Sequence, residues 1–422
     1  MIACGAGWED AMSTEWTPMR WPADWMDPSA LDLLTGASIN CLLMESDAEF
    51  GAVIARARQE GINVVQAGAP TAGVTVVDGE WPGVKLTESG ALDHAAAGPT
   101  GVPWIDSNGW KVRLASALNP GSQVWVSAAS RKPRLSAESY LMAVADAAAH
   151  GGRWIISLDS QLAEGIAARR PEALERWKRL TGAAGYFAAR KDWSGYVPEA
   201  VIGIISDFTG RNEFMSHEIL NLVARTNQQY RIIVKTAFSG SSLDGLRAVL
   251  YTDDEAPEPG LRKRILKFVE AGGMLITGPK WGDLPGAPVD GGQHPRYSLR
   301  AWGKGRLAVA RPDFEDPYIV ANDSIVLISH RYELLRFWNG GAVGSYFTMA
   351  PDRKRGVVQM LFYAFILGDN RPTVRVAGQY KTARLWTFDQ PAPRNLEMEI
   401  QKDAVELHLP PVRGYAAAEL EV

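Results

Sequence analysis

The stretch Val201-Ile202-Gly203-Ile204-Ile205-Ser206 decides the fold of this 422-residue chain. It carries no charge and is rich in β-branched side chains, a pattern that predicts a strand buried on both faces of a parallel sheet. The turn Asp207-Phe208-Thr209-Gly210 follows, and an apolar periodicity of helical type then runs from about Asn212 to Thr226. A buried strand, a polar turn and a helix in this order predict one unit of an α/β domain.

The alternation continues downstream of this unit. Tyr230–Val234 and Leu246–Tyr251 have strand patterns, a helix pattern follows, and Met274–Gly278 is a further apolar strand. Repeated strands and helices of this length predict a flavodoxin-like domain over residues 198–370. No strand is followed by a G-x-G-x-x-G or G-x-x-x-x-G-K-[ST] pattern, which argues against a nucleotide site, and no organic cofactor is implied.

The first 197 residues alternate in the same way. Strand patterns cover residues 38–44, 62–66, 123–127 and 152–158, and helix patterns separate them. Apolar strands with intervening helices indicate a parallel sheet that is covered on both faces. Residues 1–197 therefore predict a TIM-barrel-like domain with about five or six of the eight strands that a complete barrel has.

Two helices of this region can be placed more closely. Phe50, Val53, Ile54 and Ala57 recur at helical spacing and predict one apolar face. Ser136 is a typical N-cap residue and predicts the start of the next helix.

The last segment, residues 371–422, has a different period. Val374 and Val376 alternate with other residues, as do Val405 and Leu407, and prolines and a glycine separate the runs. A period of two with such turn residues predicts a small C-terminal antiparallel β-domain.

The composition excludes several classes of protein. The formal net charge is -4, from 44 Lys and Arg against 48 Asp and Glu, which argues against a nucleic-acid binder. No apolar run reaches about 18 residues, so no membrane-spanning helix is predicted. The two cysteines, Cys4 and Cys41, and six histidines without H-x-x-x-H spacing argue against a disulfide scaffold and a metal site.

The N-terminus bears on the location of the protein. Met1–Gly5 shows neither a basic nor an apolar region, so as written it is no signal peptide and a cytoplasmic protein is expected. If a signal peptide has been removed ahead of this sequence, the protein would be periplasmic or secreted.

Tryptophan is the most unusual component of the chain. Fifteen are present, and eleven of them lie at or before Trp193. An indole offers a flat apolar face and one N–H donor, which suits a sugar ring, while core packing is the alternative for any single tryptophan. The concentration in one half of the chain favours a carbohydrate site there.

Three acids follow predicted strands of the first region, namely Glu45, Asp106 and Asp159. In an α/β barrel the chemistry lies at the carboxyl ends of the strands. Hydrolysis of a glycosidic bond needs two carboxyl groups, one as acid and one as base or nucleophile. We predict Asp106 and Asp159 as this pair, with Glu45 third. The alternative for each acid is a helix N-cap or a salt bridge in a loop.

The stretch Trp104-Ile105-Asp106-Ser107-Asn108-Gly109-Trp110 is the richest in polar and aromatic groups. An amide and a carboxylate bond sugar hydroxyls, and indoles cover ring faces, so Trp104, Asn108 and Trp110 are predicted to hold the substrate. The alternative is a capped junction between a strand and a helix. Gln66 and Arg131 are further polar candidates for substrate binding.

In the order of its parts, the chain resembles the beta-galactosidases of glycoside hydrolase family 42. Ala143–Trp154 resembles the helix and final barrel strand of that family, and Trp302–Arg306 resembles a Gly-Lys-Gly strand. Val201–Arg211 and Gly272–Gly278 resemble its class I glutamine-amidotransferase-like trimerisation domain. The resemblance implies a carbohydrate substrate, two catalytic carboxylates and a homo-oligomer.

Two departures from the family keep alternatives open. The family has a glutamate nucleophile at the end of the seventh barrel strand, whereas Val124–Arg131 contains no carboxylate. No cysteine lies beyond Cys41, so the amidotransferase-like part lacks a thiol nucleophile. A glycoside hydrolase therefore competes with a non-catalytic carbohydrate-binding or scaffolding protein, and with a protein-interaction module.

Overall fold

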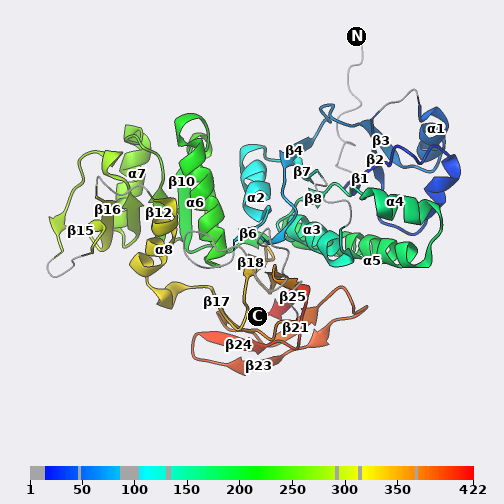
Figure 1. Cartoon of the computed structure of the whole chain (residues 1–422). Helices are drawn as coiled ribbons and strands as arrows, with labels where there is room; N and C mark the ends of the chain where they lie inside the picture. Colours follow the sequence, from blue (N-terminus) through cyan, green and yellow to red (C-terminus); the bar gives the residue numbers. More distant parts are fainter. Residues whose placement is uncertain are drawn as a thin grey trace, which may run out of the picture.

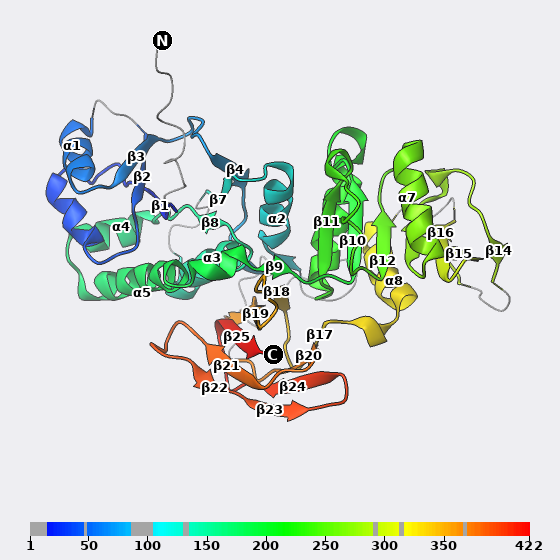
Figure 2. The ribbon, with the colours of Figure 1, turned by 180° about the vertical axis from the view of Figure 1, so that it is seen from behind.

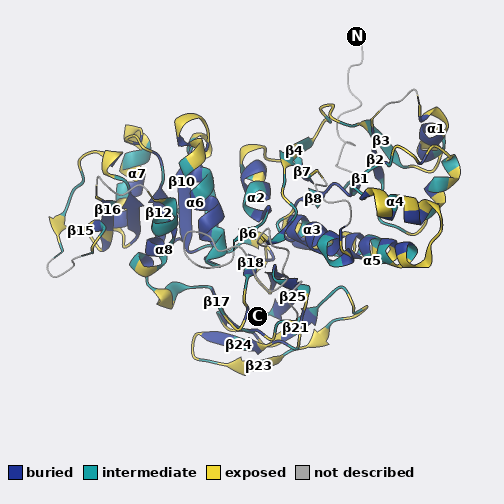
Figure 3. Cartoon of the chain, in the orientation of Figure 1, coloured by how far each residue is buried: buried dark blue, intermediate teal, exposed yellow. Residues whose placement is uncertain are grey.

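The computed structural model describes residues 15–45, 49–85, 104–129, 135–289, 294–311, 316–365 and 369–422. The chain is a mixed α/β protein, as the sequence predicts, and its strands form three blocks (Figure 1). Buried residues fill the strands and the inner helix faces, and exposed residues cover the outer faces and the loops (Figure 3). Among the described helices, none has the length and hydropathy that crossing a membrane requires.

The first block is built on short parallel strands. These are β1 (Pro18–Arg20), β2 (Cys41–Met44), β3 (Asn63–Gln66), β4 (Val74–Asp78), β7 (Gln123–Ser127) and β8 (Arg153–Trp154). Two sheets, ordered β1-β2-β3 and β4-β7-β8, are joined by a parallel bridge between Met19 and Ile156. The six strands lie in chain order around the block, as in an α/β barrel, but the described residues form no pairing between β3 and β4.

Helices and a short hairpin complete this block. They are α1 (Gly51–Gln59), α2 (Gly109–Leu118), α3 (Ala137–Ala149), α4 (Ser160–Ala167), α5 (Pro171–Ala188) and the antiparallel pair β5 (Gly83–Val84) and β6 (Ile105–Asp106). The predicted apolar face of α1 is confirmed, since Phe50, Val53, Ile54 and Ala57 are all buried. Ser136 caps α3 as predicted, because its Oγ accepts from the Ser139 N–H at 3.0 Å.

Most tryptophans of the first block serve its core. Six of them are buried, namely Trp21, Trp25, Trp125, Trp154, Trp177 and Trp193. Trp104 and Trp110 are half-buried and are the ones that border the second block. The abundance of tryptophan therefore reports packing more than ligand binding.

The second block is a seven-stranded sheet ordered β11-β10-β12-β13-β16-β15-β14. Its strands are β10 (Ile202–Ser206), β11 (Tyr230–Val234), β12 (Ala248–Tyr251), β13 (Met274–Thr277), β14 (Ala287–Pro288), β15 (Tyr297–Trp302) and β16 (Gly305–Ala310). The first five strands of this order are parallel and run 2-1-3-4-5 in chain order, which is the order of flavodoxin-like sheets.

Helices cover both faces of this sheet. They are α6 (Glu213–Arg225), α7 (Pro259–Glu270) and α8 (Pro317–Ile328). Ile204 packs in the cluster that contains α6 and α8, whereas its neighbour Ile205 packs in the cluster that contains α7. Because successive strand residues point to opposite faces, the uncharged run at 201–206 is explained by burial on both sides.

The third block consists of two antiparallel sheets with a shared core. One sheet has the order β17-β20-β24-β23, and the other has the order β22-β21-β25-β19-β18-β9. The strands are β9 (Val197–Pro198), β17 (Leu335–Trp338), β18 (Val343–Met349), β19 (Arg355–Phe362), β20 (Thr373–Ala377), β21 (Thr382–Trp386), β22 (Arg394–Asn395), β23 (Glu397–Ile400), β24 (Ala404–His408) and β25 (Gly414–Glu421). β17, β18 and β19 thus precede residue 371, and β9, which comes before the second block, pairs with β18 (Figure 2).

Candidate functional site

The three candidate acids all lie in connections that follow parallel strands of the first block. Glu45 comes directly after β2, and Asp159 comes three residues after the bridge at Ile156. Asp106 lies in β6, within the connection from β4 to α2. Such connections gather at the carboxyl edge of a parallel sheet. No hydrogen bond between described residues joins any two of the three carboxyl groups.

Asp159 is the N-cap of α4. Its Oδ1 accepts from the Leu162 N–H at 2.9 Å, and its Oδ2 accepts from the Leu135 N–H at 3.2 Å and from the Tyr140 hydroxyl at 3.0 Å. The residue is 3% exposed. This carboxylate is thus buried and engaged by three donors, which is the geometry of the capping alternative.

The Asp159→Ala variant is expected to lose about 2 kcal/mol of stability, because one helix cap disappears and buried donors lose their acceptor. Urea unfolding followed by circular dichroism measures this loss. The matched control is Asp316→Ala, which removes the exposed N-cap of α8. Equal stability of Asp159→Ala and wild type would contradict the capping role.

Glu45 belongs to a polar surface that it forms with Arg20 and Gln66 at the ends of the adjacent strands β1, β2 and β3. Its carboxylate pairs with Arg20 at 2.8 Å, and 64% of its side chain is exposed. Gln66 ends β3 and is exposed, and it lies opposite Met44 in the β2–β3 register. An exposed ion pair such as that of Arg20 and Glu45 stabilises a protein by only about 0–1 kcal/mol, so both of these side chains are available to a ligand.

Asp106 has the most altered environment of the three acids. It is half-buried, and its Oδ1 accepts from the Trp104 Nε1–H at 3.2 Å. Burial raises the pKa of Asp106, the charge of Lys85 lowers it, and the charge of Glu80 raises it again. Glu80 is exposed and lies two residues beyond β4. One carboxyl with a raised pKa near a second, exposed carboxylate is the arrangement that acid–base chemistry uses.

Sequence reasoning missed Glu80. The signal that points to it is its place directly after a strand and before Trp81, but the pattern at Val74–Val77 is a weak one. The indole of Trp81 packs edge-on against Tyr140 and Trp154, with ring centroids 5.4 and 4.9 Å apart.

Trp104 borders a cavity of about 610 Å³ between the first two blocks and the start of β18. The Arg225 guanidinium lies 3.7 Å from the Trp104 ring centroid and donates to the Ile105 carbonyl. Tyr318 adds an aromatic wall, and Glu218 adds a carboxylate. A space with two aromatic walls and several polar groups suits a ligand of sugar size.

The side-chain amide of Asn108 makes its hydrogen bonds to other residues of the protein. Its Oδ1 accepts from the Glu80 N–H at 2.8 Å, and its Nδ2 donates to the Glu80 carbonyl at 2.8 Å and to Asp146 Oδ2 at 2.9 Å. It is completely buried, as is Asp146, whose Oδ1 accepts from the Tyr363 hydroxyl at 2.6 Å. Asn108 therefore fixes the connection that carries Glu80.

The remaining candidates lie elsewhere. The ring of Trp110 packs 5.5 Å from His217, between α2 and α6. Arg131 lies outside the described residues. Of the residues predicted from the sequence, Trp104 thus bonds Asp106, and Glu45 and Gln66 lie at the ends of the neighbouring strands β2 and β3.

Comparison with known proteins gives a likeness of fold. The sequence matches no family model, and no curated protein sequence matches it. Among solved structures, the chain is similar to alpha-L-fucosidase isoenzyme 2 from Paenibacillus thiaminolyticus, with a TM-score of 0.54 and 10% identity over 93% of this chain and 79% of that chain. A beta-galactosidase from Bacillus circulans sp. alkalophilus has a TM-score of 0.49 and 12% identity, over 89% of this chain and 66% of that chain. For a rhamnosidase from Novosphingobium sp. PP1Y the values are 0.49 and 10%, over 89% of this chain and 38% of that chain.

The chain spans less than two thirds of the latter two proteins. The fucosidase likeness covers nearly the whole chain, and at this identity it shows a shared fold. The chain therefore shares a fold with one glycoside hydrolase, and the family 42 layout with an amidotransferase-like domain stays a prediction.

Proposed function

We propose that this chain is a carbohydrate-active protein of glycoside-hydrolase type, with Asp106 as the acid and Glu80 as the second carboxylate. The observation that supports it most is the raised pKa of the half-buried Asp106, beside the Trp104 indole and near the exposed Glu80. The fold shared with a fucosidase gives this arrangement a suitable framework.

The proposed chemistry divides the work between two carboxyl groups with different environments. Asp106, held protonated to higher pH by burial, donates its proton to the leaving glycosidic oxygen. Glu80, which is exposed, acts on the anomeric carbon as nucleophile or through a water molecule. Trp104 and Tyr318 cover the ring faces of the sugar in the neighbouring cavity. Pairs of Asp106 with Asp159 or with Glu45 are the competing assignments.

A screen on 4-nitrophenyl glycosides, including fucosides, galactosides and rhamnosides, tests this function. We expect turnover by the wild type and a loss of about 10³-fold in kcat/KM in Glu80→Gln, because the second carboxylate acts in the transition state. The control is Glu45→Gln, for which we expect turnover within about twofold of the wild type, as for an exposed residue that makes no transition-state contact.

Two results would reassign the site. Turnover that survives Glu80→Gln but disappears in Glu45→Gln would assign the role of second carboxylate to Glu45, on the polar surface of Arg20, Glu45 and Gln66. Turnover that survives both would remove the Asp106–Glu80 assignment.

A non-catalytic carbohydrate-binding or scaffolding protein is the second candidate. Two observations favour it: β7 ends at Ser127 without a following carboxylate in the described residues, and the Asp159 carboxylate is engaged as a cap. Binding of a sugar in calorimetry, with no turnover of any glycoside, would establish this alternative.

A further inference from the structure

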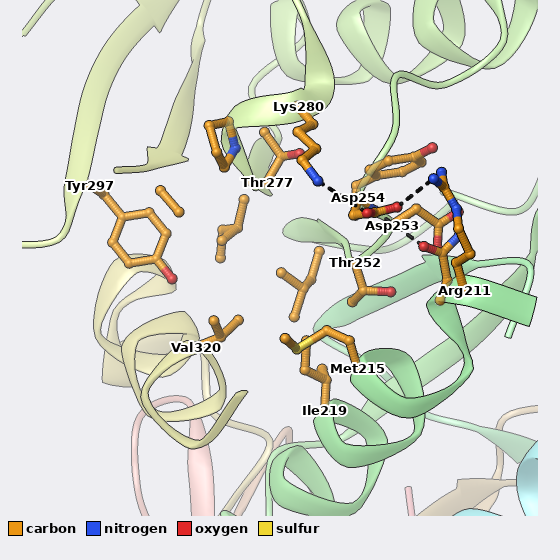
Figure 4. Close-up of a pocket in the computed structure, with 17 residues that line it drawn as sticks. Arg211, Met215, Ile219, Thr252, Asp253, Asp254, Thr277, Lys280, Tyr297 and Val320 are labelled. Atoms are coloured by element: carbon orange, nitrogen blue, oxygen red, sulfur yellow. Dashed lines mark hydrogen bonds and ion pairs between the residues drawn. The ribbon is translucent and has the colours of Figure 1, made fainter. Parts of the chain in front are cut away.

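The seven-stranded sheet holds a second cavity, of about 330 Å³, at the carboxyl ends of β12 and β13. Its apolar part is formed by Leu250 and Ile276 on the sheet face, by Met215 and Ile219 of α6, and by Val320 of α8. Figure 4 shows Tyr297 and Val320 on one side of this space and Met215 and Ile219 below it. The carboxyl ends of parallel strands are where α/β sheets bind ligands.

The mouth of this cavity carries charges of both signs. Asp254 is shared by two cations, since its Oδ1 lies 3.4 Å from Arg211 and its Oδ2 lies 3.1 Å from Lys280. The three side chains are exposed by 47%, 74% and 65% respectively, so a ligand can reach all of them. Figure 4 places them at the end of the cavity away from Tyr297.

A second group of charges adjoins the mouth. Lys235 pairs there with Asp253 and, at 3.3 Å, with Asp207. The Asp253 side chain is fully buried and also accepts from the Ser206 hydroxyl. Lys235 faces both aspartates there, and Glu255 links this cluster to the mouth, since it lies 3.5 Å from Lys235 and 3.3 Å from Arg211. Arg211, Lys280 and Asp254 are the exposed charged side chains that line the cavity itself.

A buried hydroxyl also lacks a partner at this cavity. Thr277 is 2% exposed and lines the cavity, and its Oγ1 has no hydrogen-bond partner among the described residues. An unsatisfied buried polar group costs about 1–3 kcal/mol, so a polar ligand atom would remove a penalty at this position.

We propose that this cavity binds a free α-amino acid with an apolar or aromatic side chain. The ammonium group would pair with Asp254 and the carboxylate with Arg211 and Lys280, while the side chain fills the space lined by Met215, Ile219 and Tyr297. A zwitterion matches a mouth that holds both charges, and the apolar body matches the walls. Nucleotides fit less well, because Asp254 and the nearby Glu255 would repel several phosphate charges.

Isothermal titration of the full chain with L-phenylalanine tests the proposal. We expect saturable binding, and binding at least about tenfold weaker for 3-phenylpropionate, phenethylamine and glycine, each of which lacks one of the three recognised groups. Asp254→Asn should weaken binding of L-phenylalanine but not of 3-phenylpropionate. The double variant Arg211→Gln, Lys280→Gln should weaken both, and Lys263→Gln, on the exposed part of α7, is the control.

Absence of binding by L-phenylalanine, L-leucine and L-methionine at millimolar concentration would overturn the proposal. Equal binding of phenylalanine and 3-phenylpropionate would overturn the amino-acid assignment. The cavity is remote in sequence from Asp106 and Glu80, and the titration needs no glycoside. A negative result here would therefore leave the proposed function unaffected.

Discussion

The Asp106→Asn variant is expected to fold normally and to lose about 10²- to 10⁴-fold in kcat/KM on glycosides with poor leaving groups, the range that a general acid contributes. On 2,4-dinitrophenyl glycosides the loss should be small, because that phenol departs without a proton. The variant should also lose the alkaline limb of the kcat/KM profile, since that limb reports the pKa of the acid in the free enzyme. Burial places this pKa above the ordinary value of an aspartate.

Initial rates on both leaving groups over a range of pH measure these effects. Asp24→Asn is the matched control, because Asp24 is an exposed acid of the same block. Equal losses on good and poor leaving groups would show that Asp106 does not act as the acid.

Asp146 and His150 are expected to give opposing pH dependences of stability. Burial raises the pKa of Asp146 from its usual 3.8 to about 6, so its contribution to the free energy of unfolding falls as the pH rises from 4 to 6. Burial lowers the pKa of His150 from 6.5 to about 4, so its contribution rises with pH over nearly the same window. Each effect amounts to about 3 kcal/mol, and in the wild type the two nearly cancel.

When either residue is replaced, the pH dependence that the other gives to the free energy of unfolding should become visible. As the pH rises from 4 to 6.5, the free energy of unfolding of Asp146→Asn should increase by about 3 kcal/mol. As the pH rises from 4 to 6, that of His150→Gln should decrease by about 3 kcal/mol. Urea unfolding at several pH values measures both slopes, and the double variant corrects for all other groups. Profiles parallel to the wild type in both single variants would refute the assignment.

Asp146→Asn should also lower stability at every pH. Asp146 accepts from the Asn108 N–H and side chain and from the Tyr363 hydroxyl, and an amide cannot accept from all of these donors. The contacts link α3 to the end of β19, so their loss should loosen the junction between the first and third blocks.

The sequence predicts those elements whose pattern follows from local burial. The run at Val201–Ser206 is a strand buried on both faces, Ser136 caps its helix, and the apolar face of α1 is as expected. In these cases the residue type and its spacing follow directly from the secondary structure, and tertiary contacts do not reverse them.

The candidate site was harder to predict, because contacts with residues far away in the sequence determine which of its side chains are free to meet a ligand. Asn108 seemed a sugar ligand, but it bonds Glu80, 28 positions away, and Asp146, 38 positions away. Asp159 seemed an acid, but Tyr140 and Leu135 occupy its carboxylate. Composition cannot separate a ligand-facing indole from one in the core, and six of the tryptophans are buried.

Strand β9 has a consequence for how such a chain can change over evolution. Pro198 pairs with Thr348, and the Glu199 N–H donates to the Phe347 carbonyl at 3.0 Å. The chain segment that enters the seven-stranded sheet therefore lies beside the strand that follows this sheet in sequence. A segment whose two ends meet in this way can be gained or excised as one cassette by recombination. Excision would uncover the surface of α2 around Trp110, the Trp104 indole that Arg225 covers, and the part of β18 that Gln229 bonds.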